Sequence, residues 1–238
     1  MTRSANQSAE EPGHRSGPGE PASGPGAAVL ELVAVMDRLR SPGGCPWDAE
    51  QTHRSLARYL LEETYEVLEA LDTGDRDHLR EELGDLLLQV VFHARIAAEH
   101  ADDPWGIDDV AGDIAAKLVR RHPHVFADVP PSDGPVDAEA VEARWERQKS
   151  VEKGRTSVLD GVPRALPALA LADKMLGRLA RAGLDVPPVA DGDASVGGRL
   201  LALVAQARTQ GVDPEAALRT TLAALAGRVR TAEAAHGS

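Results

Sequence analysis

The 238-residue chain is predicted to fold entirely into α-helices. Only 3% of its residues are aromatic, so its core must consist mainly of Leu, Val and Ala, which suit helices better than strands. Along most of the chain, apolar residues recur with the three- and four-residue spacing of amphipathic helices. Clusters of Gly and Pro interrupt these runs and mark the loops between them. The expected architecture is therefore a series of helices packed against one another.

The expected helices follow an N-terminal segment, residues 1–27, that we expect to be disordered because it has no periodic apolar residues. Thr52 or Ser55 should cap the second helix, and Gly74 should end it in a left-handed conformation. The loop that follows is short, so the second and third helices should be antiparallel neighbours. Helices are expected at Ala27–Leu39, Ser55–Leu71, Asp77–Glu99, Asp108–Arg121, Asp137–Lys153, Ala168–Ala182, Gly197–Thr209 and Asp213–Ala235.

Two acidic segments on the second and third expected helices are the most informative part of the sequence. Residues 61–66 read Leu-Glu-Glu-Thr-Tyr-Glu, and residues 81–85 read Glu-Glu-Leu-Gly-Asp. At about 100° per residue, Glu63 falls inside the apolar stripe of its helix, and Glu82 lies beside the stripe of the next one. These stripes consist of Leu56, Leu60, Val67 and Leu71, and of Leu79, Leu83, Leu86 and Val90.

Ionised carboxylates on a core-facing stripe are costly unless they are paired or bound to a cation. Arg76 and Arg80 are nearby, but they belong to the hairpin turn or the residues just after it. A bound divalent metal ion is the more economical explanation, and hard oxygen ligands suit Mg²⁺ or Mn²⁺. The alternative is a solvated acidic face whose carboxylates pair with Arg or Lys along the helix.

Composition excludes several classes of protein. The net charge is -12, with 38 acidic against 26 basic side chains, which argues against a nucleic-acid binder or a membrane-surface protein. There is one cysteine, so no intramolecular disulfide can form and a cytoplasmic location is expected. No apolar run approaches the roughly 20 residues of a transmembrane helix. The chain also lacks the glycine-rich phosphate-binding loop of motor and switch NTPases.

Five motifs together closely resemble the MazG family of nucleoside triphosphate pyrophosphohydrolases. They are Cys-Pro-Trp-Asp at 45–48, Leu-Glu-Glu-Thr-Tyr-Glu-Val at 61–67, Glu-Leu-Gly-Asp-Leu-Leu at 82–87, Lys-Leu-Val-Arg-Arg-His-Pro-His-Val-Phe at 117–126 and Arg-Trp-Glu at 144–146. The resemblance implies a catalytic domain at about 28–153 with a four-helix core completed by dimerisation. It also implies Mg²⁺-dependent cleavage of an NTP between the α and β phosphates, giving NMP and pyrophosphate.

The resemblance also assigns candidate site residues. The metal ligands would be Glu62, Glu63, Glu66, Glu82 and Asp85, whose three- and four-residue spacings project them to adjoining helix faces. Glu63, the deepest in its stripe, is the candidate to take a proton from the attacking water.

Candidate substrate contacts come from cations and tryptophans. Lys117, Arg120 and Arg121 could bind the triphosphate, as could Arg144 and Lys149 more weakly. The alternative for these cations is a favourable interaction with the dipole at a helix C-terminus. Trp47 and Trp145 could stack on a base; packing is the preferred reading for Trp145, and both readings stay open for Trp47.

The C-terminal part, residues 154–238, is expected to be a smaller helical unit. Longer members of the family carry two tandem copies of the domain. Here the C-terminal part resembles a second copy that has degenerated. Gly-Gly-Arg-Leu-Leu at 197–201 occupies the place of the Glu-x-Gly-Asp-Leu-Leu motif, and no acidic helix precedes it. We therefore expect this unit to lack metal ligands and to have a structural or dimer-stabilising role.

The function expected from these observations is Mg²⁺-dependent NTP pyrophosphohydrolysis in nucleotide-pool house-cleaning, by a homodimer. One alternative keeps the fold and narrows the substrate to dUTP or a phosphoribosyl nucleotide. The other is a non-catalytic helical protein for dimerisation or interaction, in which the acidic residues bind metal only structurally.

Overall fold

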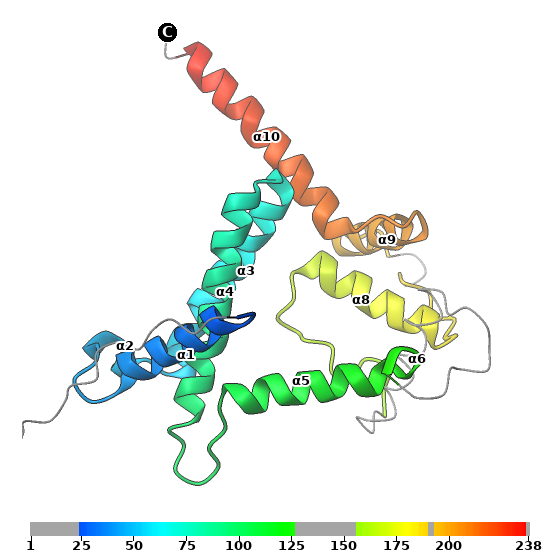
Figure 1. Ribbon diagram of the computed structural model, residues 1–238. Helices are drawn as coiled ribbons and strands as arrows, with labels where there is room; N and C mark the ends of the chain where they lie inside the picture. The colour runs from blue at the N-terminus through cyan, green and yellow to red at the C-terminus, as the bar shows by residue number, and fades with distance from the viewer. Residues whose placement is uncertain (1–23, 127–155, 190–192, 237–238) are drawn as a thin grey trace, which may run out of the picture. The chain divides into compact units, whose positions relative to one another are not determined.

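The computed structural model describes residues 24–126, 156–189 and 193–236, and all regular structure within these ranges is α-helical, as predicted (Figure 1). The described residues divide into two compact units, with the boundary inside α5 after Val119. The expected helix at 137–153, the expected domain boundary after it and residues 1–23 of the expected tail lie outside these ranges. The helices are α1 Ala27–Arg40, α2 Pro46–Glu50, α3 His53–Thr73, α4 Arg76–Ala97, α5 Ile107–Arg121, α6 Pro123–Phe126, α8 Ala168–Arg181, α9 Val196–Thr209 and α10 Pro214–His236.

The α3–α4 hairpin is the main element of the N-terminal unit, and its two helices lie side by side (Figure 1). Thr52 caps α3 through a reciprocal pair of hydrogen bonds with Ser55, so the predicted cap is confirmed. Gly74 ends α3 with φ of 72°, the left-handed conformation that the sequence predicts. The Asp75 carboxylate then accepts hydrogen bonds from the backbone N–H groups of Asp77 and His78 and starts α4.

The apolar core lies where α1 crosses the end of the hairpin remote from Gly74. Its buried residues are Met36 from α1, Leu56 from α3, and Val91 and Phe92 from α4. The ring of Trp47 in α2 packs edge-on against Phe92, at 6.5 Å between centroids. The core therefore fixes one end of the hairpin and leaves the acidic segments between core and turn.

The apolar stripes predicted for the hairpin are only partly buried. Leu56 is 1% exposed, whereas Leu60, Leu71, Leu83 and Val90 are 37%, 55%, 49% and 38% exposed. Within residues 86–92, Gln89, Val91 and Phe92 are buried. Among the described helices, the contacts of α4 outside the hairpin are mainly with α1. Periodicity therefore identifies an apolar face without saying what covers it.

In the C-terminal unit, α8 is in contact with both α9 and α10. Arg178 of α8 is 6% exposed. One of its terminal nitrogens donates to the backbone carbonyls of Val158 and Asp160, at 3.0 and 2.6 Å, and so ties the preceding segment to α8. None of the described helices combines the length and apolar character needed to cross a membrane.

Candidate metal centre

Three glutamates from the two hairpin helices meet in one cluster. Glu63 and Glu66 come from successive turns of α3, and Glu82 comes from the second turn of α4. One carboxylate oxygen of each lies within 4.8 Å of those of the other two. The antiparallel hairpin therefore has the axial register that brings the two acidic motifs together, which helical spacing alone could not establish.

The other two predicted ligands differ in their relation to this cluster. The negative charge of Asp85 raises the pKa of both Glu63 and Glu82, which places it beside them. Glu62 is exposed, and the structure does not bring it into the three-glutamate group. The roles of all five residues as metal ligands remain predictions.

Burial and mutual repulsion make the cluster unfavourable when its carboxylates are ionised. Burial, then the charge of Asp85, then a hydrogen bond with Glu66 raise the pKa of Glu63 from 4.5 to about 7. Burial and the charge of Glu66 likewise raise the pKa of Glu82. A bound divalent cation would offset both the burial of the ionised carboxylates and their mutual repulsion, because each carboxylate would be attracted to the cation. The residues present therefore fit a metal ion.

His78 is a member of the site that the sequence analysis missed. Its Nε2 lies 3.0 Å from Glu82 Oε1, one helical turn away on α4. The charge of His78 lowers the pKa of Glu82, against the effects of burial and Glu66. The four-residue spacing between His78 and Glu82 was the available signal, because such pairs face each other on a helix. Arg80, which the sequence offered as a partner, pairs with Asp77 instead.

Comparison with known proteins shows which family the chain belongs to. A model of the MazG nucleotide pyrophosphohydrolase domain matches residues 51–126, which contain both acidic motifs. An uncharacterised 26.1 kDa protein of Streptomyces cacaoi is 52% identical over 88% of this chain and 84% of its own length. The chain belongs to the MazG family.

Named enzymes of the family are also similar to the chain. The nucleoside triphosphate pyrophosphohydrolase of Mycobacterium tuberculosis is 46% identical over 90% of this chain, and that of Escherichia coli is 48% identical over 68% of it. This chain spans 61% and 62% of the lengths of those two enzymes. Part of each of these two relatives is therefore unmatched.

The predicted substrate contacts of this MazG chain are only partly placed. Trp47 is 50% exposed, and its ring packs edge-on against Tyr59 and Phe92. Trp47 therefore packs against neighbouring rings and also keeps part of its surface open to solvent. Lys117, Arg120 and Arg121 occupy the last turns of α5, and Arg121 is buried. Their contact with substrate stays a prediction. Arg144, Trp145 and Lys149 lie outside the described residues.

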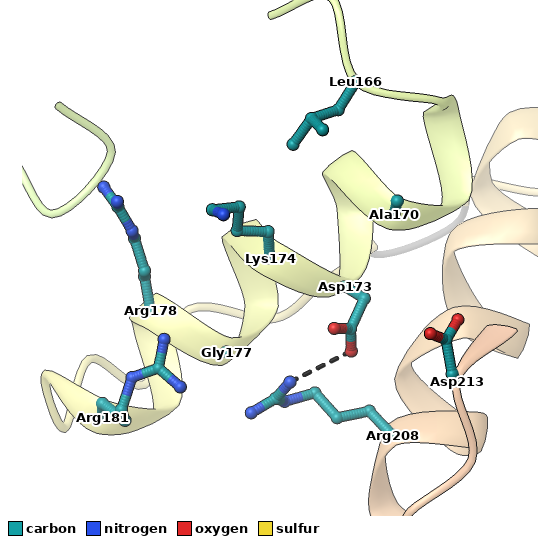
Figure 2. Close-up of a pocket in the computed structure, with 9 residues that line it drawn as sticks. All are labelled: Leu166, Ala170, Asp173, Lys174, Gly177, Arg178, Arg181, Arg208 and Asp213. Carbon is teal, nitrogen blue, oxygen red and sulfur yellow. Dashed lines mark hydrogen bonds and ion pairs between the residues drawn. The ribbon is translucent and has the colours of Figure 1, made fainter. Parts of the chain in front are cut away.

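The C-terminal unit contains a cavity of about 310 Å³ that, unlike the glutamate cluster, is lined by cationic as well as acidic side chains (Figure 2). Its two carboxylates already have structural partners: Asp173 binds Arg208 at 3.0 Å, and Asp213 accepts the N–H groups that begin α10. A Cβ on Gly177 would lie 2.8 Å from a terminal nitrogen of Arg208, so the missing side chain lets this guanidinium lie against α8. Its lining residues are Leu166, Ala170, Asp173, Lys174, Gly177, Arg178, Arg181, Arg208 and Asp213. Within the described part of the chain, the only metal-capable acidic group is the one in the N-terminal unit.

Proposed function

We propose that this protein is a Mg²⁺-dependent nucleoside triphosphate pyrophosphohydrolase that cleaves between the α and β phosphates and acts in nucleotide-pool house-cleaning. The observation that carries the proposal is the cluster of Glu63, Glu66 and Glu82 across two antiparallel helices. The names of the M. tuberculosis and E. coli relatives support the same reaction. Mg²⁺ fits an all-carboxylate site because it prefers oxygen ligands and completes its shell with water and substrate phosphates.

Glu63, Glu66 and Glu82 would hold the metal, together with Asp85. When bound, Mg²⁺ neutralises charge on the phosphates and lowers the pKa of an attacking water. The protein must then supply a group that accepts the proton of that water. We assign this role to a Glu63 carboxylate oxygen, because Glu63 lies inside the apolar stripe of α3 and belongs to the cluster that would hold the metal. His78 holds the Glu82 carboxylate in place from the preceding turn.

We also propose that the protein is a homodimer in which a second copy covers the exposed apolar face of the hairpin. Leu60 and Leu71 on α3, and Leu83 and Val90 on α4, are each more than a third exposed. Large apolar surfaces of this kind mark interaction sites in folded proteins. These apolar residues lie on the same two helices as the acidic cluster. A second copy bound to them would therefore also restrict the access of water to the site.

The proposed reaction is tested by analysing products. The purified protein is incubated with each common NTP and dNTP, including dUTP, in Mg²⁺ or in EDTA, and NMP, NDP, phosphate and pyrophosphate are resolved. We expect NMP and pyrophosphate only in Mg²⁺. NDP with phosphate would contradict the proposed cleavage position, and turnover of dUTP alone would narrow the substrate class.

Paired variants locate the reaction in the cluster. Glu66→Gln should lower turnover by about 100-fold or more, because even residues behind metal ligands are worth about 10- to 100-fold. Glu69→Gln makes the same chemical change one turn further along α3, at an exposed position outside the cluster, and should leave turnover unchanged. Equal losses in both variants would move the reaction elsewhere. A protein that binds Mg²⁺ and turns over no nucleotide would instead be a non-catalytic member of the family.

A further inference from the structure

Gln89 is a buried polar residue to which the proposed reaction has not yet assigned a role. It lies in the most apolar stretch of α4 and is 5% exposed. Its side-chain Oε1 is buried and has no hydrogen-bond partner. Native structures rarely leave a buried carbonyl oxygen without a donor, because the group has lost its hydration and gained nothing in return. A donor that arrives with a ligand would satisfy it.

The position of Gln89 on α4 relates it to the metal centre. It follows Asp85 by four residues and Glu82 by seven, so it lies within about 40° of both around the helix axis. Along the axis, it is about 6 Å beyond Asp85, roughly one turn. Gln89 therefore shares the face of α4 that carries the candidate ligands and lies one turn nearer the core.

Two contacts between α3 and α4 show that this face of α4 lies along the seam of the hairpin, that is, the interface between the two helices. On one side of Gln89, Glu82 meets the glutamates of α3. On the other side, His93 Nδ1 lies 2.7 Å from Nδ1 of His53, the first residue of α3. Gln89 falls between these two contacts along α4, so the contacts on both sides of it fix its backbone at the interface with α3. Its orphan oxygen thus belongs to the same inter-helix surface as the metal centre.

Aromatic rings lie at this level of the hairpin. Phe92 follows Gln89 by three residues on α4, and Tyr59 precedes Glu63 by one turn on α3. The Trp47 ring packs edge-on against both, with centroids 6.0 Å from Tyr59 and 6.5 Å from Phe92, and half of its side chain is exposed. Arg58 lies over the Tyr59 ring and Arg40 over the Phe92 ring, so Trp47 is the exposed ring of the three. An exposed aromatic ring can stack on a nucleobase, because every base offers a π-face.

We propose that Gln89 determines recognition of the nucleoside, with its Oε1 accepting a hydrogen bond from an N–H of the base or an O–H of the sugar. This inference rests on the proposed function, which holds the triphosphate at the glutamate cluster. The sugar and base extend from the α phosphate along the α3–α4 interface toward Gln89 and the exposed Trp47 ring. The residue acts on substrate choice and affinity, and the carboxylates act on the phosphates.

The test compares Gln89→Leu with the wild type for each NTP and dNTP. Removing the acceptor leaves a substrate donor unpaired in a buried site, so kcat/KM should fall about tenfold or more, mainly through KM. The melting temperature should stay the same or rise, because the variant replaces an unsatisfied polar group with an apolar one of similar size. The matched control is Gln206→Leu on α9, where the glutamine is exposed and turnover should be unchanged.

The pattern across substrates identifies the donor. A loss that differs among bases assigns the hydrogen bond to the base, and a loss that is smaller for dNTPs than for NTPs assigns it to the 2′-hydroxyl. Unchanged KM values for all substrates would overturn the inference, as would a fall in kcat alone, which would indicate disturbed carboxylates. A change in oligomeric state without a change in KM would overturn it too, because the missing donor would then belong to a second copy.

The proposed function and this inference can fail separately. If the wild type makes NMP and pyrophosphate and Gln89→Leu has the same kinetics, only the inference fails. If the wild type turns over nothing, calorimetric titration with a non-hydrolysable α,β-methylene NTP in Mg²⁺ decides. A roughly tenfold weaker affinity of Gln89→Leu for this analogue supports the inference, and equal affinities, or no binding by either protein, overturn it.

Discussion

Glu62 and Glu63 are neighbours in the chain with different surroundings, which gives a prediction about the metal. Glu62 is exposed, whereas Glu63 belongs to the three-glutamate cluster. Glu63→Gln should weaken binding of Mg²⁺ or Mn²⁺ by about 10- to 100-fold, and Glu62→Gln should have a much smaller effect. Isothermal titration of the two variants measures the difference. Equal losses of affinity would mean that Glu62 also reaches the ion, as the family resemblance implies.

The raised pKa of Glu63 predicts how the stability of the metal-free protein depends on pH. The carboxyl binds its proton more tightly in the folded state, where its pKa is about 7, than in the unfolded chain, where it is near 4.5. Its contribution to stability is therefore fully present below about pH 4.5 and is lost as the pH rises through 7. In EDTA, the wild type should have a lower melting temperature at pH 8 than at pH 6 relative to Glu63→Gln, which cannot ionise.

Magnesium provides the control for that pH dependence. A cation bound to the ionised cluster stabilises the folded state most where the carboxylates have lost their protons. Added Mg²⁺ should therefore raise the melting temperature more at pH 8 than at pH 6. A wild type and a Glu63→Gln variant with parallel pH profiles in EDTA would show that Glu63 titrates normally in the folded protein.

Two glycines of the α3–α4 hairpin should respond in opposite ways to alanine. Gly74 has φ of +72°, and an alanine there would adopt a conformation that costs about 1–2 kcal/mol. Gly84 lies within α4, and beyond the neighbouring backbone of α4 no atom lies within 4 Å of the place that a Cβ would occupy, so alanine should stabilise the helix by about 0.5–1 kcal/mol. Urea denaturation of Gly74→Ala and Gly84→Ala measures both changes. A destabilised Gly84→Ala would indicate that a second copy approaches this glycine closely.

Local chemistry explains which parts of the hairpin could be predicted from the sequence. Thr52 and Gly74 mark the ends of α3 because capping and left-handed turns depend on a few adjacent residues. Glu63 could be selected because a carboxylate in an apolar stripe needs a cation or a partner. These predictions use only spacing along one helix, which the sequence contains in full.

The remaining features depend on contacts between segments far apart in the chain. The meeting of Glu66 with Glu82 requires the right axial register of two helices, which depends on packing in the core cluster that contains Leu56 and Phe92. The pair between Arg40 and Glu99, at 2.7 Å, likewise joins α1 to the residues just beyond α4. No sequence pattern near either residue of that pair predicts its partner. The unpartnered oxygen of Gln89 is also invisible in the sequence, where this residue is one polar position in an apolar run.

On the scale of the whole molecule, the proposed homodimer predicts that one face of the hairpin controls association. Leu71 on α3 is 55% exposed and contributes little to the core of its own protomer. Leu71→Lys should therefore leave the fold intact and shift the protein from dimer to monomer, because a lysine at an apolar interface must lose its hydration. Sedimentation equilibrium measures the mass, and circular dichroism checks the helix content.

Leu222 on α10 offers a matched control for that experiment, since it is 52% exposed and belongs to the C-terminal unit. Leu222→Lys introduces the same charge on a helix of similar exposure and should leave the dimer intact. If Leu222→Lys dissociates the dimer and Leu71→Lys does not, the C-terminal unit holds the two copies together. The hairpin face would then stay open beside the glutamate cluster, and closure of the site by a second copy would be ruled out.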